Sequence, residues 1–118
     1  MLLRGVAAAQ SALSAESRRL QASAHNRANT LTEGFQALRV TNVEAAVPGA
    51  GVETQVGVVE PLGPPIVDPS GDVIGHASNV SFVDEALTRL TAQRAYEANL
   101  VSLQAHVDTA DDLLDVVG

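Results

Sequence analysis

The pattern of apolar and polar residues predicts a long helix at the C-terminal end of the chain. Val80 to Val117 contains no Gly or Pro, and Ala, Leu, Gln and other residues of high helix propensity fill it. At 1.5 Å per residue such a helix would be roughly 57 Å long, which exceeds the diameter of a small domain. A helix of this length needs a packing partner.

Apolar residues within this stretch recur at alternating spacings of three and four, which is the pattern of a coiled-coil seam. An earlier stripe of Val83, Leu87 and Leu90 does not continue into it, because the segment 91–99 interrupts the repeat. The partner that covers the seam is either the N-terminal helix of the same chain or a helix of a neighbour. The seam comprises Leu100, Leu103, Val107, Ala110, Leu114 and Val117.

A second helix is predicted from residue 2 to about residue 29, where no Pro occurs. Val6, Leu13 and Leu20 stand seven residues apart and form one track of a heptad, while the second track is weak. An isolated helix of this kind is marginal in water, so packing must hold it. We expect it to pair with the C-terminal helix.

The segment between the helices predicts short strands. Residues 35–43 read as an extended piece, and 52–59 alternate Val or Thr with polar residues and Gly, which is typical of a half-buried strand. Two apolar pairs, at 66–67 and 73–74, flank an Asp-Pro-Ser-Gly turn and predict a β-hairpin. Ser81 and Asp84 form a capping box at the start of the second helix.

These elements predict a mainly α fold with a small β insert. Residues 1–30 and 79–118 form a helical unit in which the two ends of the chain pair as an antiparallel or bundled coiled coil. Residues 31–78 form the hairpin-containing insert, which we expect at one end of the helix pair. One domain is also what 118 residues predict.

The amino-acid composition limits the classes of molecule that this protein can bind. The net charge of −7 argues against nucleic acid, since phosphate binding needs a basic face. Residues 1–40 hold five Arg and two Glu, giving +3, whereas 41–118 hold two Arg and twelve acids, giving −10. Opposite signs favour contact between the two ends, within one chain or between neighbours. No apolar run is long enough to span a membrane, and the N-terminus does not resemble a cleaved signal peptide.

No constellation predicts catalysis or a bound cofactor. The chain has no Cys, and His25, His76 and His106 share no metal-ligand spacing. We therefore expect neither an enzyme, a metal site nor a small-molecule substrate. The acidic residues near the C-terminus either form a solvated face or pair with arginine side chains of another subunit, for which Arg4, Arg18 and Arg19 are candidates. Those acids are Asp108, Asp111, Asp112 and Asp115.

Two segments resemble the axial proteins of the bacterial flagellum. One is the Arg-Ala-Tyr-Glu-Ala-Asn run formed by Arg94, Ala95, Tyr96, Glu97, Ala98 and Asn99. The other is the Asn-Arg-Ala-Asn run with a following Thr, Gly and Phe, whose motif positions are Asn26, Ala28, Asn29, Thr32, Gly34 and Phe35. Within the family, the short length and the segment 67–73 are most similar to the proximal rod proteins.

The resemblance implies a structural subunit of the flagellar basal-body rod. Such a subunit pairs its terminal helices and packs them against itself and other rod proteins, and the flagellar export apparatus carries it to the periplasmic rod without signal cleavage. The motif residues become candidate subunit contacts, together with the seam positions of both helices. An alternative of a different class is a helical-hairpin adaptor outside the flagellum that forms a closed oligomer.

Overall fold

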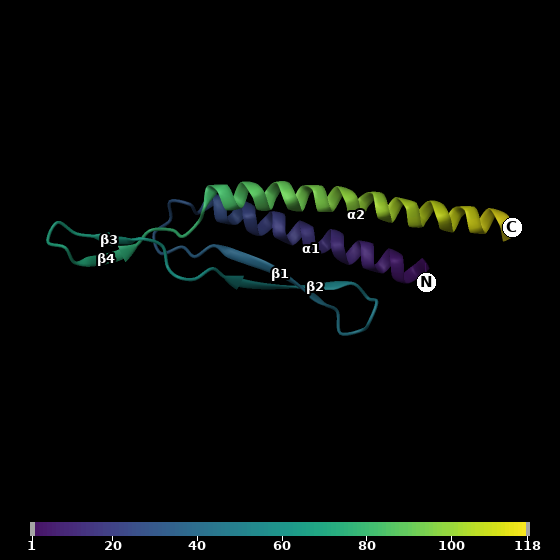
Figure 1. Ribbon diagram of the computed structural model, residues 1–118, viewed down its shortest axis with the longest axis horizontal. Coiled ribbons are helices and arrows are strands. Elements are labelled where there is room, and N and C mark those ends of the chain that lie inside the picture. Colours follow the sequence, from purple (N-terminus) through teal and green to yellow (C-terminus); the bar gives the residue numbers. More distant parts are fainter. Residues whose placement is uncertain (1, 118) are drawn as a thin grey trace.

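A computed structural model describes residues 2–117; residues 1 and 118, where the predicted helical unit begins and ends, lie outside the described part. The chain runs through helix α1 (Leu2–Ala28), strands β1 (Leu38–Glu44), β2 (Val52–Val58), β3 (Pro65–Val67) and β4 (Val73–His76), and helix α2 (Phe82–Val117). Two long helices with a small two-sheet β insert are therefore the observed architecture (Figure 1).

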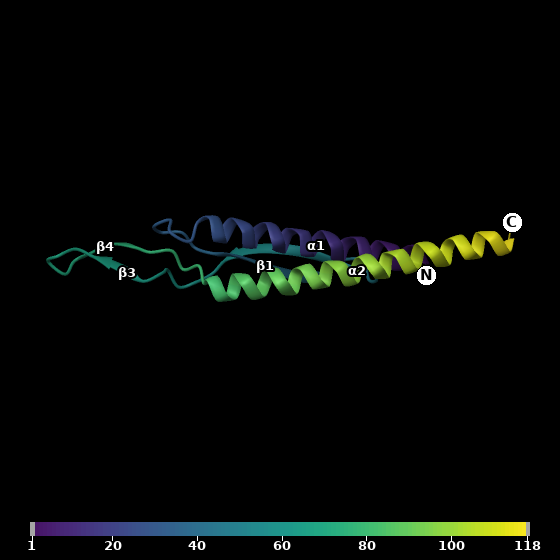
Figure 2. The same ribbon diagram turned by 90° about the horizontal axis from the view of Figure 1, so that it is seen from above.

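The two helices pair side by side in antiparallel order (Figures 1 and 2). Ser23 near the end of α1 contacts Glu85 near the start of α2, and Gly5 near the start of α1 faces His106. A Cβ on Gly5 would lie 2.7 Å from the His106 ring, so glycine permits this close approach. Because α1 begins at Leu2, the last two turns of α2 extend past it.

Strands β1 and β2 pair as an antiparallel hairpin, from Leu38 opposite Val58 to Glu44 opposite Val52. This hairpin lies along α1, on the side away from α2 (Figure 1). The expectation that the whole insert stands at one end of the helices is therefore wrong. Polar side chains of α1 reach the hairpin and hold it there: Arg18 donates to Thr54 at 3.0 Å, and Arg19 donates to Asn42 at 3.1 Å.

Strands β3 and β4 form the predicted hairpin, which projects beyond the helices (Figure 1). The Gly71 amide donates to the Asp68 carbonyl at 3.0 Å, which closes the predicted turn. The Asp68 carboxylate accepts hydrogen bonds from the Ser70 hydroxyl, the Asp72 amide and the Ser70 amide, and these lower its pKa below the ordinary value of 3.8. The turn is thus stabilised locally, by Asp68 itself.

The start of α2 follows the predicted cap. The Ser81 hydroxyl accepts a hydrogen bond from the Asp84 amide at 3.3 Å, and the Ser81 carbonyl accepts from the Glu85 amide. Asp84 and Glu85 place negative charge in the first turn, where the helix dipole favours it.

The buried apolar core is very small. Among the described residues, the buried apolar side chains are all alanines: Ala9, Ala15, Ala37 and Ala92. The radius of gyration is 20.3 Å and the extents are 80 × 26 × 14 Å, whereas a compact chain of this length has a radius of roughly 13 Å. The accessible surface of 7998 Å² also exceeds the roughly 6,100 Å² expected of a compact monomer of this mass.

Candidate functional site

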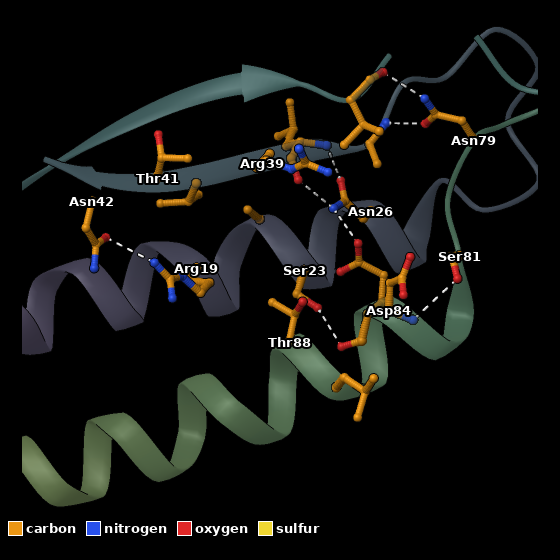
Figure 3. A pocket seen from close by; sticks show the side chains of 17 residues that line it. Arg19, Ser23, Asn26, Arg39, Thr41, Asn42, Asn79, Ser81, Asp84 and Thr88 are labelled. Atoms are coloured by element: carbon orange, nitrogen blue, oxygen red, sulfur yellow. Dashed lines mark hydrogen bonds between the residues drawn. The ribbon is translucent and has the colours of Figure 1, made fainter. Parts of the chain in front are cut away.

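A buried asparagine joins three elements where α1 ends. Asn26 is 1% exposed, accepts a hydrogen bond from the Leu38 amide at 2.7 Å and donates to the Leu38 carbonyl at 2.9 Å. The same amide nitrogen donates to Glu85 Oε1 at 2.8 Å, and Ser23 donates to the Glu85 carbonyl at 3.3 Å. Asn26 thereby fastens α1 to β1 and to α2 at one point (Figure 3).

Asn79 performs the same task on the other side of this junction (Figure 3). Its Oδ1 accepts from the Ala37 amide at 2.6 Å, and its Nδ2 donates to the carbonyls of Val59 and Pro61 at 2.8 and 2.9 Å. Both hydrogen-bonding sides of the amide are used, so the ends of β1 and β2 are fixed relative to the start of α2.

A cleft of about 750 Å³ opens beside this junction, between β1, α1 and α2 (Figure 3). Its lining includes Arg19, Arg39, Asp84 and Glu85 but no His, Cys or Lys. Glu85 Oε2 is buried without a hydrogen-bond partner among the described residues. The polar groups of the cleft join secondary-structure elements, and they form no paired nucleophile and base.

The three histidines lie far apart in different surroundings. His25 packs edge-on against Phe35 with ring centroids 5.5 Å apart, His76 Nδ1 lies 2.9 Å from the Gly63 carbonyl, and His106 faces Gly5. Within residues 2–117 no group of three or more His, Cys, Asp or Glu residues could hold a metal ion. In the same range, neither helix combines the length and the hydropathy needed to cross a membrane.

The N-terminal motif forms the turn that leaves α1. Asn29 donates from its side chain to the His25 carbonyl at 2.9 Å and accepts from the Thr32 hydroxyl at 3.1 Å. Gly34 has φ of +71° and donates its amide to the His76 carbonyl, while the Phe35 carbonyl accepts from the Asn79 amide. Ala28 is exposed. Most of this motif therefore makes contacts within the chain.

The C-terminal motif lies in the middle of α2 and divides between two faces. Ala95 and Asn99 are half-buried, and Asn99 donates to the Ala95 carbonyl at 2.8 Å. Arg94, Glu97 and Ala98 are exposed, and Tyr96 is 36% exposed. Arg94 and Glu97 form no ion pair in the described structure. The exposed members are available to another molecule.

The side of α2 that faces α1 coincides with the predicted apolar seam only at Leu103 and Ala110. Small and polar residues occupy that side, so the segment 91–99, which interrupts the apolar repeat, continues the packing face without a break. Sequence reasoning missed this stripe because it followed large apolar residues; small side chains at heptad spacing were the signal. The buried and half-buried positions are Glu85, Thr88, Ala92, Ala95, Asn99, Leu103, His106 and Ala110.

The other seam residues, together with Leu103 at its edge, lie on a flank of the helix pair that no other element within residues 2–117 covers. On α1, Val6, Leu13 and Leu20 are half-buried and continue at heptad spacing to Arg27. Arg27 shares a groove with Phe82, Arg89, Ala86 and Gln93 of α2. From these α2 residues, steps of seven lead to Tyr96 and Leu103 and to Leu100, Val107 and Leu114. Both tracks therefore lie on the same side of the pair.

We call this side the open flank and define it by Val6, Leu13, Leu20, Tyr96, Leu100, Leu103 and Val107. Leu100 is 50% exposed and Val107 is 42% exposed, whereas Leu103 is half-buried. Leu114, which is 69% exposed, lies beyond the N-terminal end of α1. The open flank is an apolar strip that follows both helices and ends in the groove at Arg27. Compared with protein-family models and with curated proteins, the chain matches none.

Proposed function

We propose that this chain is a structural subunit of the bacterial flagellar basal-body rod. The observation that carries the proposal is the open flank, an apolar strip along two paired helices that the described residues leave uncovered. A solvent-exposed apolar strip of this kind marks a surface for association. The two sequence motifs that resemble flagellar axial proteins, at residues 26–35 and 94–99, support an axial assembly of the flagellum as the destination of this surface.

The size of the surface supports association with other subunits. The accessible surface is 7998 Å², about 1,900 Å² above that of a compact monomer of the same mass. A standard protein interface buries about 1,600 Å² in total. Each partner contributes about 800 Å² of that area, so the excess corresponds to about two such contacts. The buried apolar side chains among the described residues are all alanines, which leaves the larger side chains for those contacts.

The proposed role is mechanical. A neighbouring helix lies along the open flank, and the contact is heterologous, so that successive subunits extend an assembly that does not close on itself. Packing then transmits torque, and no reaction is catalysed. The partners are further copies of this chain and other rod proteins, and delivery to the periplasmic rod uses the flagellar export apparatus without signal cleavage. Within the rod family, the short length and the segment 67–73 make this chain resemble the proximal rod protein FlgC.

A second function fits the same surface. The open flank and its groove are also suited to one partner helix, which would make the protein an adaptor that forms a closed oligomer. The two proposals differ in whether association stops at a fixed size. They share the fold and the absence of catalysis.

Light scattering and sedimentation velocity across a hundredfold range of concentration separate the two proposals. Open-ended growth of the mean mass with concentration supports the rod subunit, whereas one small oligomer at all concentrations supports the adaptor. Basal bodies purified from the cells that express the protein, probed with antiserum to this chain, test the location. Absence of the chain from that fraction would overturn the rod assignment.

A further inference from the structure

The groove at one end of the open flank combines apolar walls with two guanidinium groups. Its volume is about 450 Å³, and its lining consists of Arg27 from α1 and Phe82, Ala86, Arg89, Leu90 and Gln93 from α2. Phe82 and Leu90 are exposed there, and neither arginine forms an ion pair among the described residues. The groove therefore suits a helix that carries both apolar and acidic side chains.

Such a helix end exists at the opposite end of the molecule. The overhang, which we define as residues 111–117, extends past α1, and Leu113, Leu114, Val116 and Val117 are exposed on it. Asp111, Asp112 and Asp115 lie among them, with Asp108 one turn earlier. The last turn of α2 holds no basic residue, so these carboxylates oppose the helix dipole without compensation.

None of the arginines that sequence analysis named as partners for these acids forms an ion pair with them among the described residues. Arg4 lies beside Gly49 in the loop between β1 and β2. Arg18 donates to Thr54, and Arg19 donates to Asn42 and lies 3.8 Å from Glu16. The overhang and the groove cannot meet within one chain, because the helix pair separates them (Figure 1). Only a second molecule can bring them together.

We propose that the overhang of one copy docks in the groove of a second copy, with its aspartates against Arg27 and Arg89. This inference rests on the proposed function and adds to it a specific longitudinal contact. Apolar burial of the overhang supplies the driving force, and the arginines neutralise the helix end. The two surfaces differ, so the contact is heterologous and each docked copy presents a fresh groove and a fresh overhang.

Charge exchange between the two surfaces tests the contact in the full-length protein. The groove variant carries Arg27→Glu and Arg89→Glu, and the overhang variant carries Asp111→Lys and Asp115→Lys. We expect each variant alone to need at least a tenfold higher protein concentration than the unaltered chain before its assemblies grow in mass. An equimolar mixture restores growth to within about threefold, since each altered surface then meets its complement.

A matched control carries Arg39→Glu, Ala46→Glu and Gln55→Glu, three exposed positions outside the groove that together give the same change in net charge as the groove variant. The control assembles like the unaltered chain. Circular dichroism verifies that all variants keep their helix content. Growth of the unaltered chain should also weaken as salt rises from 0.05 to 0.5 M, because screening acts on exposed pairs.

The outcomes separate this inference from the proposed function. If both variants grow as the unaltered chain does, or if the mixture fails to restore growth, the contact is overturned while open-ended assembly stands. If the unaltered chain stops at a small closed oligomer, both proposals fall together. If the helix that docks in the groove instead belongs to another protein, the charge substitutions would abolish binding of that protein but leave the self-assembly of each variant unchanged. That outcome also overturns the contact between copies.

Discussion

The two flanks of the helix pair are made from different chemistry. Towards the β1–β2 hairpin, α1 presents Ser11, Arg18, Arg19 and Asn26, each of which makes a hydrogen bond to a strand. The open flank presents Val, Leu and Tyr side chains, and no other element within residues 2–117 covers it. The chain thus folds by directional polar contacts and close packing of small residues, and it leaves its non-directional apolar surface for association.

The largest expected effect comes from removing the polar link of the folded flank. Asn26→Ala leaves the Leu38 amide and carbonyl and a Glu85 oxygen without their partner. The free energy of unfolding should fall by about 3 kcal/mol, because buried polar groups lose hydrogen bonds. Urea unfolding at low protein concentration measures this loss.

Asn29→Ala is the matched control, since its side-chain bonds lie on the exposed turn and its loss should stay near ~0.5 kcal/mol. Equal effects of the two substitutions would contradict the distinction between a buried link and a surface turn.

Substitutions on the open flank should weaken association between chains and leave the folded single chain unchanged. Leu100→Asp with Val107→Asp should weaken association about a hundredfold, because two apolar side chains of about 1.5 kcal/mol each no longer bury their surface. Helix content should not change, since both side chains are exposed in the single chain. Sedimentation equilibrium and circular dichroism measure the two quantities.

Thr91→Asp with Thr109→Asp adds the same charge on another exposed side of α2 and serves as the control. Should the control variant associate as poorly as the Leu100 and Val107 variant, net charge rather than the open flank would govern assembly.

Tyr96 tests a smaller part of the same flank. Tyr96→Ala should weaken association about tenfold, as expected for a half-exposed aromatic anchor, and leave the helix content unchanged. Tyr96→Phe keeps the ring and should associate almost normally. A parallel loss of association and helix content in Tyr96→Ala would show that the ring packs within its own chain.

The smallest effect belongs to neither flank and concerns the β3–β4 turn. Hydrogen bonds from Ser70 and Asp72 lower the pKa of Asp68, so the folded turn favours the carboxylate. This contribution is complete above pH 3.8 and is lost as pH falls through the lowered pKa. The amide NMR shift of Ser70 should change below pH 3.8 and stay constant in Asp68→Asn. A change that begins well above pH 3.8 would contradict the assignment.

The elements of this fold could be predicted from sequence because their signals are local. The break-free run of α2, the alternation of β2, the Asp-Pro-Ser-Gly turn and the Ser81 cap each involve neighbouring residues, and all are observed. The arrangement of those elements could not be predicted in the same way. Nothing in 38–58 indicates that its hairpin lies along α1, since Arg18 and Arg19 could equally have faced solvent.

The candidate site was also predictable only where its residues carry a local, periodic signal. Heptad spacing identified the open flank, because large apolar residues carry a clear periodic signal. Of the face that α1 covers, it identified only Leu103 and Ala110; the other positions are Glu, Thr, Ala, Asn and His residues. The roles of Asn79 and Glu85 depend on partners 20 and 59 residues away, and no local pattern marks them. Asn26 was noticed through a resemblance, yet its buried, bridging role emerged only in three dimensions.

The hydrogen bonds of Asn26 also imply an order of folding. Its link to Leu38 closes a loop of 12 residues, whereas its link to Glu85 spans 59. Loop-closure entropy makes the second about 1.4 kcal/mol more costly, so we expect α1 and its hairpin to come together first and α2 to dock last. The open flank needs both helices. It is therefore completed only in the final step, and a chain that is still folding offers its neighbours no finished surface to which they could bind.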